Sequence, residues 1–257
     1  MIFRLAQRAV YFGDLPNAYN TDMRKLVQEL VVYDQPEACP YLPGQTSRLP
    51  LRMPLRKLSP AEFDVRLEAG ERRSGPLLYT THCPACQACQ PLRLDVNLFT
   101  PSRTQLRVRK RGLKLFRTEL GPARVDSQRV ALYNRHKHER GLSRGEQRID
   151  LDNYHEFLVH SCCDTREIAY YLDEQLVMVA IIDVGATSLS AVYTYFNPDV
   201  SHLSPGTYSV LEQVDLCRQW NRRYLYLGYY VVGSEHMVYK AQYRPHERLI
   251  DGQWRTM

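Results

Sequence analysis

The sequence predicts an α+β protein with a mixed, mostly antiparallel sheet and flanking helices. Residues 167–172, 175–184 and 188–196 form three consecutive strand-like runs that are joined by short polar connections. A helical pattern follows over 207–220, and residues 224–230 form one more strand-like run. The second half of the chain is therefore expected to contain an antiparallel meander, a helix and a returning strand.

This order of elements is that of a GNAT-like acyltransferase core. A change in sequence character predicts two regions: residues 1–122, an α+β region that contains most of the cysteines, and residues 123–257, the transferase region. The alternation of leucine and methionine over 49–55 suits a short edge strand. Ser59 then predicts a helix N-cap, and the helix is expected to end at Gly70.

Composition restricts the class of protein. The chain has 257 residues, of which 44% are hydrophobic, which is enough for a sizeable core. It contains no apolar run of membrane-spanning length, and residues 1–10 lack the apolar segment of a signal peptide. An odd number of cysteines, seven, favours free thiols or metal ligation over disulfides. These features predict a cytoplasmic protein.

Four cysteines form a candidate sulfur site. Cys83, Cys86 and Cys89 follow one another at two-residue spacing, and Cys39 lies in a similar Cys-Pro context upstream. If the two loops meet, their thiols could bind a metal ion or a cluster. A catalytic or purely structural thiol group is the alternative.

A block of basic residues lies between residues 101 and 117, which contain no acidic residue. It comprises Arg103, Arg107, Arg109, Lys110, Arg111, Lys114 and Arg117. Such a block suits the neutralisation of nucleic-acid phosphates, although a solvated helix face is an equally good interpretation. A second basic cluster covers 135–148, where only two glutamates dilute it.

Several motifs carry a resemblance to a known family. They are Arg72–Gly75, Ser190–Phe196, Gly206–Tyr208, Tyr224–Tyr230 and Gly233–Ala241. In this order they resemble the arginyl-tRNA-protein transferase family, and more narrowly its short bacterial branch, the aspartate/glutamate leucyltransferases. The resemblance implies an enzyme that moves leucine, or alternatively arginine, from charged tRNA to the N-terminal Asp or Glu of proteins. The modified proteins are then degraded through the N-degron pathway.

The implied reaction is the aminolysis of an activated ester, for which positioning alone supplies roughly 7–11 kcal/mol and no cofactor is required. The acidic N-terminus of the acceptor demands a cation. Its candidate ligands are Arg72, Arg73, Ser74 and Arg93. Ion pairs of these arginines with Glu68 or Glu71 are the alternative. The tRNA would lie on the basic block.

Tyrosines can hold the ester and move protons, and a lysine can stabilise an oxyanion. The candidates are Tyr193, Tyr195, Tyr229 and Lys240. Burial in the core is the competing interpretation for the tyrosines, and an ion pair with Glu235 is the competing one for Lys240. The resemblance further implies a zinc or iron–sulfur site on Cys39, Cys83, Cys86 and Cys89, although relatives with adjacent cysteines differ from the spacing here.

Two other functions compete. An acetyl-CoA-dependent acetyltransferase of the same fold would need a glycine-rich pyrophosphate loop, whereas residues 202–207 contain one glycine and Pro205 lacks an amide donor. A non-catalytic zinc module that binds RNA would explain the cysteines and the basic residues. It leaves the tyrosine-rich second half unexplained.

Overall fold

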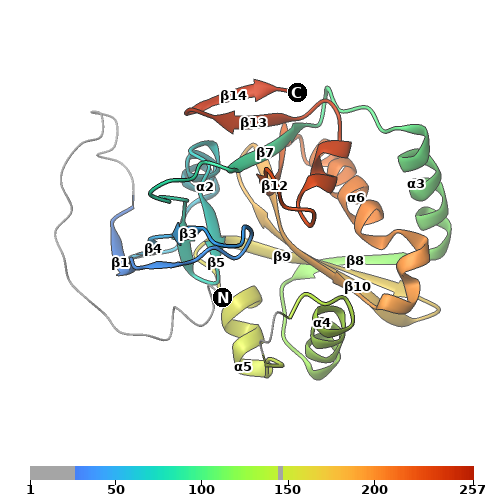
Figure 1. The fold of residues 1–257 in the computed structure, drawn as a ribbon. Coiled ribbons are helices and arrows are strands. Elements are labelled where there is room, and N and C mark those ends of the chain that lie inside the picture. Colours follow the sequence, from blue (N-terminus) through green and yellow to red (C-terminus); the bar gives the residue numbers. More distant parts are fainter. Residues whose placement is uncertain (1–26, 144–146) are drawn as a thin grey trace.

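The computed structural model describes residues 27–143 and 147–257 (Figure 1). The segment 1–10, on which the signal-peptide prediction rests, lies outside these residues. In the first half the elements are β1 (Glu29–Tyr33), β2 (Pro36–Ala38), β3 (Thr46–Arg48), β4 (Leu51–Pro54), α2 (Pro60–Glu68), β5 (Arg72–Ser74), β6 (Leu77–Tyr79), β7 (Cys89–Asp95), α3 (Arg103–Leu115) and β8 (Arg117–Pro122). In the second half they are α4 (Ser127–Glu139), α5 (Leu151–Tyr154), η2 (His155–Val159), β9 (Asp164–Leu172), β10 (Gln175–Val184), β11 (Ser188–Phe196), η3 (Pro198–Leu203), α6 (Pro205–Gln219), β12 (Tyr224–Val231), η4 (Val238–Gln242), β13 (Glu247–Ile250) and β14 (Gln253–Thr256).

One eight-stranded sheet organises the molecule, in the order β14-β13-β7-β12-β11-β10-β9-β8. The meander of β9, β10 and β11 is antiparallel, as predicted, and β12 returns parallel to β11 after α6. The remaining neighbours in the sheet are antiparallel. The predicted mixed, mostly antiparallel sheet with flanking helices is thereby confirmed.

Helices cover both faces of this sheet (Figure 1). α3 and α6 pack over the largest cluster of buried residues, which includes Tyr208 and Leu211 of α6. α4 and the α5–η2 segment cover a second cluster that includes Tyr133 and Tyr154. The close approach of α3 to α6 requires a glycine, because a Cβ atom at Gly112 would lie 2.1 Å from the Tyr208 ring. No helix among residues 27–143 and 147–257 is long and apolar enough to span a membrane.

A four-stranded sheet, β1-β4-β6-β5, packs beside the large sheet together with α2. The helix begins with the predicted capping box, in which the Ser59 hydroxyl accepts from the Glu62 amide while the Glu62 carboxylate accepts from the Ser59 amide. The expected edge position of the 49–55 strand is wrong: β4 lies between β1 and β6, because β1 pairs along its outer side.

The large sheet draws on both halves of the chain. β7 and β8 precede residue 123, yet β7 pairs with β12 and β8 pairs with β9. The proposed division at residues 122 and 123 coincides with the end of β8. The first region therefore contributes two strands to the sheet of the second, and β7 places the cysteine loop beside β12.

Candidate functional site

The parallel strands β11 and β12 separate part way along their length. They pair only from Ser188 to Ser190 on β11 and from Tyr224 to Tyr226 on β12. β12 also carries a bulge where its register with β7 shifts between Tyr226 and Gly228. Bulges and strand separations expose backbone groups and re-aim side chains, and they are common beside active sites. This opening is the candidate site.

Two cations meet at the opening. Arg72, on β5, donates from Nη1 to the Ser190 hydroxyl at 2.9 Å and from Nη2 to the Ala191 carbonyl at 2.9 Å. Lys240, on η4, also reaches this opening, next to Gly228 of β12. A Cβ atom at Gly228 would lie 3.4 Å from Arg72 Nη2 and 3.5 Å from Lys240 Nζ. Both charged groups therefore border the backbone of the bulge.

The amine of Lys240 is buried. Only 7% of the residue is exposed, and Nζ donates to the Tyr229 carbonyl at 2.7 Å. Burial, and secondarily the positive charge of Arg72, lowers the pKa of Lys240 to about 7. The amine can consequently lose its proton near neutral pH and act as a proton acceptor. The alternative ion pair with Glu235 does not form.

No carboxylate among the described residues lies within ion-pair distance of Arg72 or Lys240, although most other buried or half-buried arginines have one. Arg72 uses two of its five N–H donors on Ser190 and Ala191, which leaves donors for a ligand. A guanidinium that has no acidic partner, next to an amine that can gain a proton, forms a site suited to an anion.

Tyr229 links this site to the cysteine loop. Its backbone carbonyl holds Lys240, and its buried hydroxyl donates to the Gly70 carbonyl at 3.3 Å. Burial raises the pKa of the Tyr229 hydroxyl well above its usual value, so the hydroxyl stays protonated. The centroid of the Tyr229 ring lies 6.3 Å from that of the Tyr79 ring. Tyr229 therefore lies at the site, but its side chain points into the core.

Two of the predicted arginines are occupied elsewhere. Arg73 follows Arg72 on β5 and so points to the opposite side, where its Nε donates to Asp183 at 2.6 Å in a fully buried pair. Arg93 pairs with Glu247 at 2.6 Å and with Glu68, as the alternative interpretation anticipated. We therefore leave both out of the proposed site.

The Arg93 guanidinium also lies between two rings, 3.9 Å from the centroid of Tyr224 and 4.1 Å from that of Trp254. These contacts connect the C-terminal hairpin of β13 and β14 to β12. Ser74, the remaining predicted ligand, is buried at the end of β5.

The tyrosines of β11 belong to an aromatic cluster under α4. Tyr195 is fully buried, and its hydroxyl shares a hydrogen bond with that of Tyr154. Tyr193 packs against Tyr133 at 5.6 Å and against Phe157 at 6.0 Å. The Tyr195 hydroxyl is therefore directed to Tyr154 and not to Arg72 or Lys240. The catalytic role of both β11 tyrosines stays a prediction.

The four cysteines predicted to meet do lie near one another. Cys39, Cys83 and Cys89 line one small cavity beside Tyr79 and Tyr229. Burial, and then the neighbouring thiols, raises the pKa of Cys89 to about 12. Within the described part of the chain, however, no group of three or more Cys, His, Asp or Glu side chains converges as metal ligation requires. A metal ion or cluster on these cysteines stays a prediction, and no step below depends on one.

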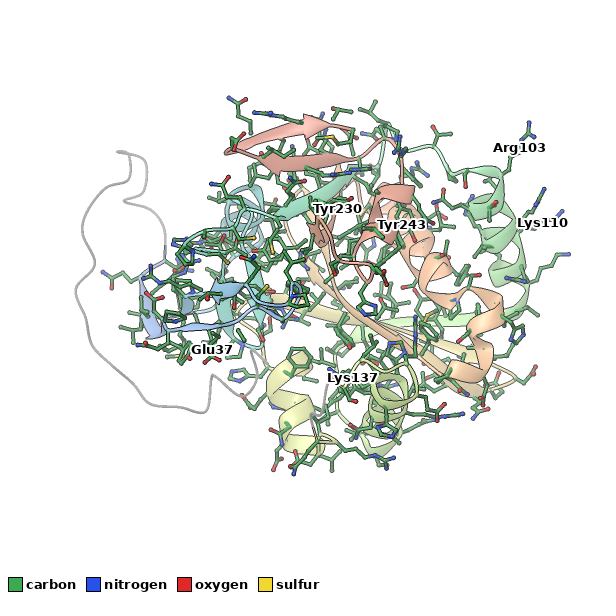
Figure 2. The ribbon with its side chains drawn as sticks, viewed as in Figure 1. Glu37, Arg103, Lys110, Lys137, Tyr230 and Tyr243 are labelled. Atoms are coloured by element: carbon green, nitrogen blue, oxygen red, sulfur yellow. The ribbon has the colours of Figure 1, made fainter. Side chains whose placement is uncertain are left out.

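Six of the seven cations of the basic block lie on helix α3, and the seventh, Arg117, begins β8. Ser102 caps α3 and exchanges hydrogen bonds with Gln105. Arg109 pairs with Asp215 at 2.7 Å. The remaining cations of the helix are exposed and have no carboxylate partner among the residues described: Arg103, Arg107, Lys110, Arg111 and Lys114. Figure 2 shows Arg103 and Lys110 projecting away from the body of the protein.

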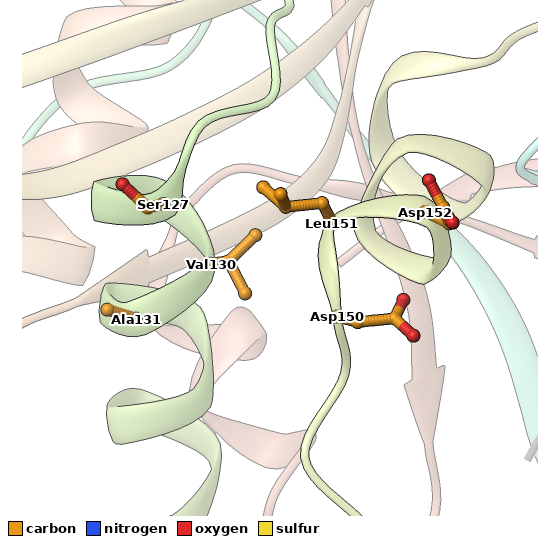
Figure 3. Close-up of a pocket in the computed structure, with 6 residues that line it drawn as sticks. All are labelled: Ser127, Val130, Ala131, Asp150, Leu151 and Asp152. Carbon is orange, nitrogen blue, oxygen red and sulfur yellow. The ribbon is translucent and has the colours of Figure 1, made fainter.

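A separate hollow of about 470 Å³ lies between the starts of α4 and α5 (Figure 3). Val130 and Leu151 point toward one another across it, and Asp150 and Asp152 also line it. Two carboxylates would repel both an acidic peptide and a nucleic acid. None of the residues predicted to be functional lines this hollow, so we do not assign it to the site.

Sequence reasoning missed Ser190, Ala191 and Gly228, which complete the site. Ser190 orients Arg72, the Ala191 carbonyl is freed by the separation of the strands, and Gly228 leaves room beside both cations. A glycine inside an otherwise bulky strand was the available signal, because such a residue often marks a bulge or a close approach.

Replacement of Gly228 by alanine is expected to abolish most of the activity. Gly228 has a φ of +82°, which an L-side chain rarely adopts, and the added methyl group would occupy the space between Arg72 and Lys240. The expected result is at least a tenfold loss of kcat/KM in a transfer assay. Thermal unfolding should show that the variant is still folded at the assay temperature. Gly252→Ala, at a similarly positive φ of +74° in an open turn, is the matched control.

Comparison with known proteins connects this geometry to a family. Residues 37–107 match the family model described as arginine-tRNA-protein transferase, N terminus, and residues 128–250 match its C-terminus counterpart. An aspartate/glutamate leucyltransferase of Chromobacterium violaceum is 37% identical over 222 residues, which cover 86% of this chain and 91% of that protein. The protein of the same name from Thiobacillus denitrificans is 38% identical over 85% of this chain and 91% of its own.

Among solved structures, the C-terminal domain of a putative lysylphosphatidylglycerol synthetase from Agrobacterium fabrum aligns with a TM-score of 0.47 at 14% identity, over 78% of this chain and 64% of that one. The sheet, the cationic opening and the named relatives together define the class of the protein: it is a transferase enzyme. The chain belongs to the arginyl-tRNA-protein transferase family.

Proposed function

We propose that the protein transfers leucine from leucyl-tRNA to the α-amine of proteins that begin with Asp or Glu. The names of the relatives supply the donor and the acceptor. One observation on this chain carries the proposal: Arg72 and Lys240 meet at the opening between β11 and β12, with no acidic partner among the described residues. Such a site suits an acceptor that carries a carboxylate on its first residue.

In the proposed reaction the α-amine of the acceptor attacks the carbonyl carbon of the ester. A C–N bond forms, the C–O bond to the terminal ribose breaks, and the proton leaves the attacking nitrogen for Lys240 Nζ. A proton returns to the ribose oxygen as it departs. Arg72 binds the acidic side chain of the acceptor and so places the amine beside the ester. The peptide bond formed is more stable than the ester consumed, so no energy source is needed.

The exposed cations of α3 suit the tRNA. Arg103, Arg107, Lys110, Arg111 and Lys114 form a charged helix face that no acidic side chain neutralises within residues 27–143 and 147–257. Contacts to phosphate require such a face and carry no sequence information. We propose that the acceptor arm of the tRNA lies along α3 and that the products enter degradation through the N-degron pathway.

Three finer proposals follow from the same premises. The order of β9, β10, β11, α6 and β12 supports a GNAT-like core, in which separated strands admit the acyl donor. The division into residues 1–122 and 123–257 falls between the two matched family models. A zinc or iron–sulfur site on Cys39, Cys83, Cys86 and Cys89 would require their side chains to reorient, and elemental analysis of protein purified without oxygen tests it.

The experiment that tests the proposed function uses labelled leucine, and separately labelled arginine, on charged tRNA. Peptides that begin with Asp, Glu, Ala or Lys are the acceptors, and acetyl-CoA is a parallel donor. Leucine is expected on the Asp and Glu peptides alone. Labelling from arginine only would change the donor, and acetylation without transfer from tRNA would contradict the proposal.

A further inference from the structure

A second arginine stacks on a tyrosine of β12. The Arg248 guanidinium lies 3.8 Å from the centroid of the Tyr230 ring. Its Nε donates to His246 Nε2 at 3.1 Å, and its Nη1 reaches the amide oxygen of Gln90 at 3.4 Å. These contacts come from β12, from β7 and from the residue that precedes β13, so three separate segments hold one guanidinium in place.

His246 fixes the direction of this guanidinium. Its imidazole is 1% exposed, and Nδ1 lies 2.9 Å from the Tyr243 carbonyl, which can only accept, so Nδ1 carries the proton. Nε2 is then the unprotonated nitrogen that accepts from Arg248. Burial lowers the pKa of His246 below its usual value, which keeps the ring neutral and able to accept. His246 is therefore a positioning residue for Arg248.

No acidic side chain neutralises Arg248. Within residues 27–143 and 147–257 no carboxylate lies at ion-pair distance from it, whereas Arg93 on the neighbouring strand β7 has both Glu68 and Glu247. Arg248 is half-buried and uses two of its five N–H donors on His246 and Gln90, which leaves the others for a ligand. A fixed guanidinium of this kind suits a phosphate group.

This stacked pair is connected to the proposed base by short paths. Tyr230 directly follows Tyr229, whose carbonyl accepts from Lys240 Nζ at 2.7 Å. The Lys240 carbonyl accepts from the Tyr243 amide at 3.3 Å, and the Tyr243 carbonyl in turn binds His246. Tyr230 also packs against the buried cluster that contains Tyr243, the residue that follows η4 (Figure 2). The free guanidinium is therefore on the side of β12 against which η4 packs, close to the opening.

The covalent structure of the donor places an anion near its reacting carbon. In a charged tRNA the amino acid is esterified to the ribose of the 3′-terminal nucleotide. The same ribose carries the 5′-phosphate that joins this nucleotide to the preceding one, so only the ribose separates the ester from the phosphate. The obligatory anion of the acceptor is its acidic side chain, which the proposed function already places on Arg72. The phosphate of the donor is thus the anion that remains for a second arginine.

We propose that Arg248 binds the 5′-phosphate of the 3′-terminal nucleotide of the charged tRNA, and that His246 and Tyr230 position its guanidinium. With the phosphate on Arg248, the ester is directed toward the opening between β11 and β12. This inference rests on the proposed function and adds the residue that would hold the end of the donor. It is independent of α3, which would contact the double-stranded acceptor arm.

Two non-hydrolysable donor analogues that differ only in the phosphate test the proposal: adenosine with a 3′-amide-linked leucine, with and without a 5′-phosphate. In calorimetry at one fixed salt concentration, the wild type is expected to bind the phosphorylated analogue ~10-fold or more tightly, the order of a hydrogen bond to a charged group. Arg248→Ala should bind both with nearly equal affinity, and His246→Phe should retain only part of the difference. Both affinities are measured on the same variant, so a general loss of stability affects them alike.

Arg223→Ala is the matched control. Arg223 also stacks on a tyrosine of β12, at 4.9 Å from the Tyr224 centroid, but it pairs with Asp95 at 2.8 Å. This variant should keep the wild-type difference between the two analogues. In steady-state kinetics, Arg248→Ala should raise the KM for leucyl-tRNA ~10-fold while the KM for an Asp-initiated peptide stays unchanged.

A preference for the phosphorylated analogue that survives in Arg248→Ala would overturn the proposal. So would a wild type that binds both analogues equally while it transfers leucine. A rise in the KM for the peptide alone would also overturn it and assign Arg248 to the acceptor. A wild type that transfers nothing from leucyl-tRNA would instead refute the proposed function.

Discussion

Replacement of Lys240 by methionine is expected to lower kcat ~100-fold or more while the KM for leucyl-tRNA changes little. Methionine fills the same buried space but has no nitrogen to accept a proton, and removal of a general base costs factors of this order. Nζ donates to the Tyr229 carbonyl and lies near the Arg72 guanidinium, and among the described residues no other charged group shifts its pKa, so none is in place to substitute for it. Quenched-flow measurement of a single turnover would isolate the chemical step.

The pH profile distinguishes a base from a structural lysine. Burial and Arg72 lower the pKa of Lys240 to about 7, so the amine becomes a proton acceptor as the pH rises through that value. The wild-type kcat should therefore rise with pH up to about 7, in addition to the limb that belongs to the acceptor's own amine. Lys240→Met should retain the second limb alone. An unchanged profile in the variant would show that Lys240 is not the base.

The same pKa shift predicts an effect on stability. The folded pKa of about 7 lies below the ordinary value of 10.5, so between these values the unfolded chain binds more protons at Lys240 than the folded protein does. The free energy of unfolding should consequently rise with pH across this window, and the rise should be smaller in Lys240→Met. Urea unfolding at pH 7 and pH 9 measures the difference.

Replacement of Arg73 by methionine is expected to destabilise the fold by about 3–5 kcal/mol, because Asp183 would keep an uncompensated charge in the core. The ion pair is buried on both sides, with 1% and 0% of the two side chains exposed. Its carboxylate also accepts from the Thr165 hydroxyl at 2.6 Å, which holds β9 and β10 together. Equilibrium unfolding in urea, followed by circular dichroism, measures the loss.

Two further variants show whether the effect belongs to the ion pair. Arg73→Met combined with Asp183→Leu should recover part of the lost stability, because both charges are then removed. Arg56→Met breaks an exposed pair with Glu62 and should change stability little. A loss in Arg73→Met no larger than that in Arg56→Met would contradict the structural role of Arg73.

Local signals in the sequence predicted the local structure well. The residues that cap α2 lie within one turn of the helix, so Ser59 and Glu62 revealed its start. The meander could also be predicted from the sequence, because Asp173 and Glu174, both with positive φ, form a tight turn between β9 and β10. The position of β4 within its sheet could not be predicted, since it depends on pairing with β1, a separate segment of the chain.

The site was predicted only in part, because its contacts likewise join segments that are distant in the sequence. Arg72 and Arg73 are neighbours with the same chemistry, and only strand alternation together with partners 118 and 110 residues away separates their roles. The structural role of Arg93 likewise depends on its ion pair with Glu247, which lies 154 residues further along the chain. Tyr195 was a catalytic candidate with burial as the alternative, and the structure buries it against Tyr154. Lys240 was identified by its chemistry, although its burial depends on the fold around η4.

The central claim is that Arg72 recognises the acidic side chain of the acceptor at the opening between β11 and β12. Its most direct test is a double cycle: kcat/KM for peptides that begin with Asp or with Asn, in the wild type and in Arg72→Ala. The wild type is expected to prefer Asp by at least ~30-fold, about 2 kcal/mol, as for a truncated charge pair, and Arg72→Ala should show almost no preference. A preference for Asp that survives intact in a folded Arg72→Ala protein would contradict the account.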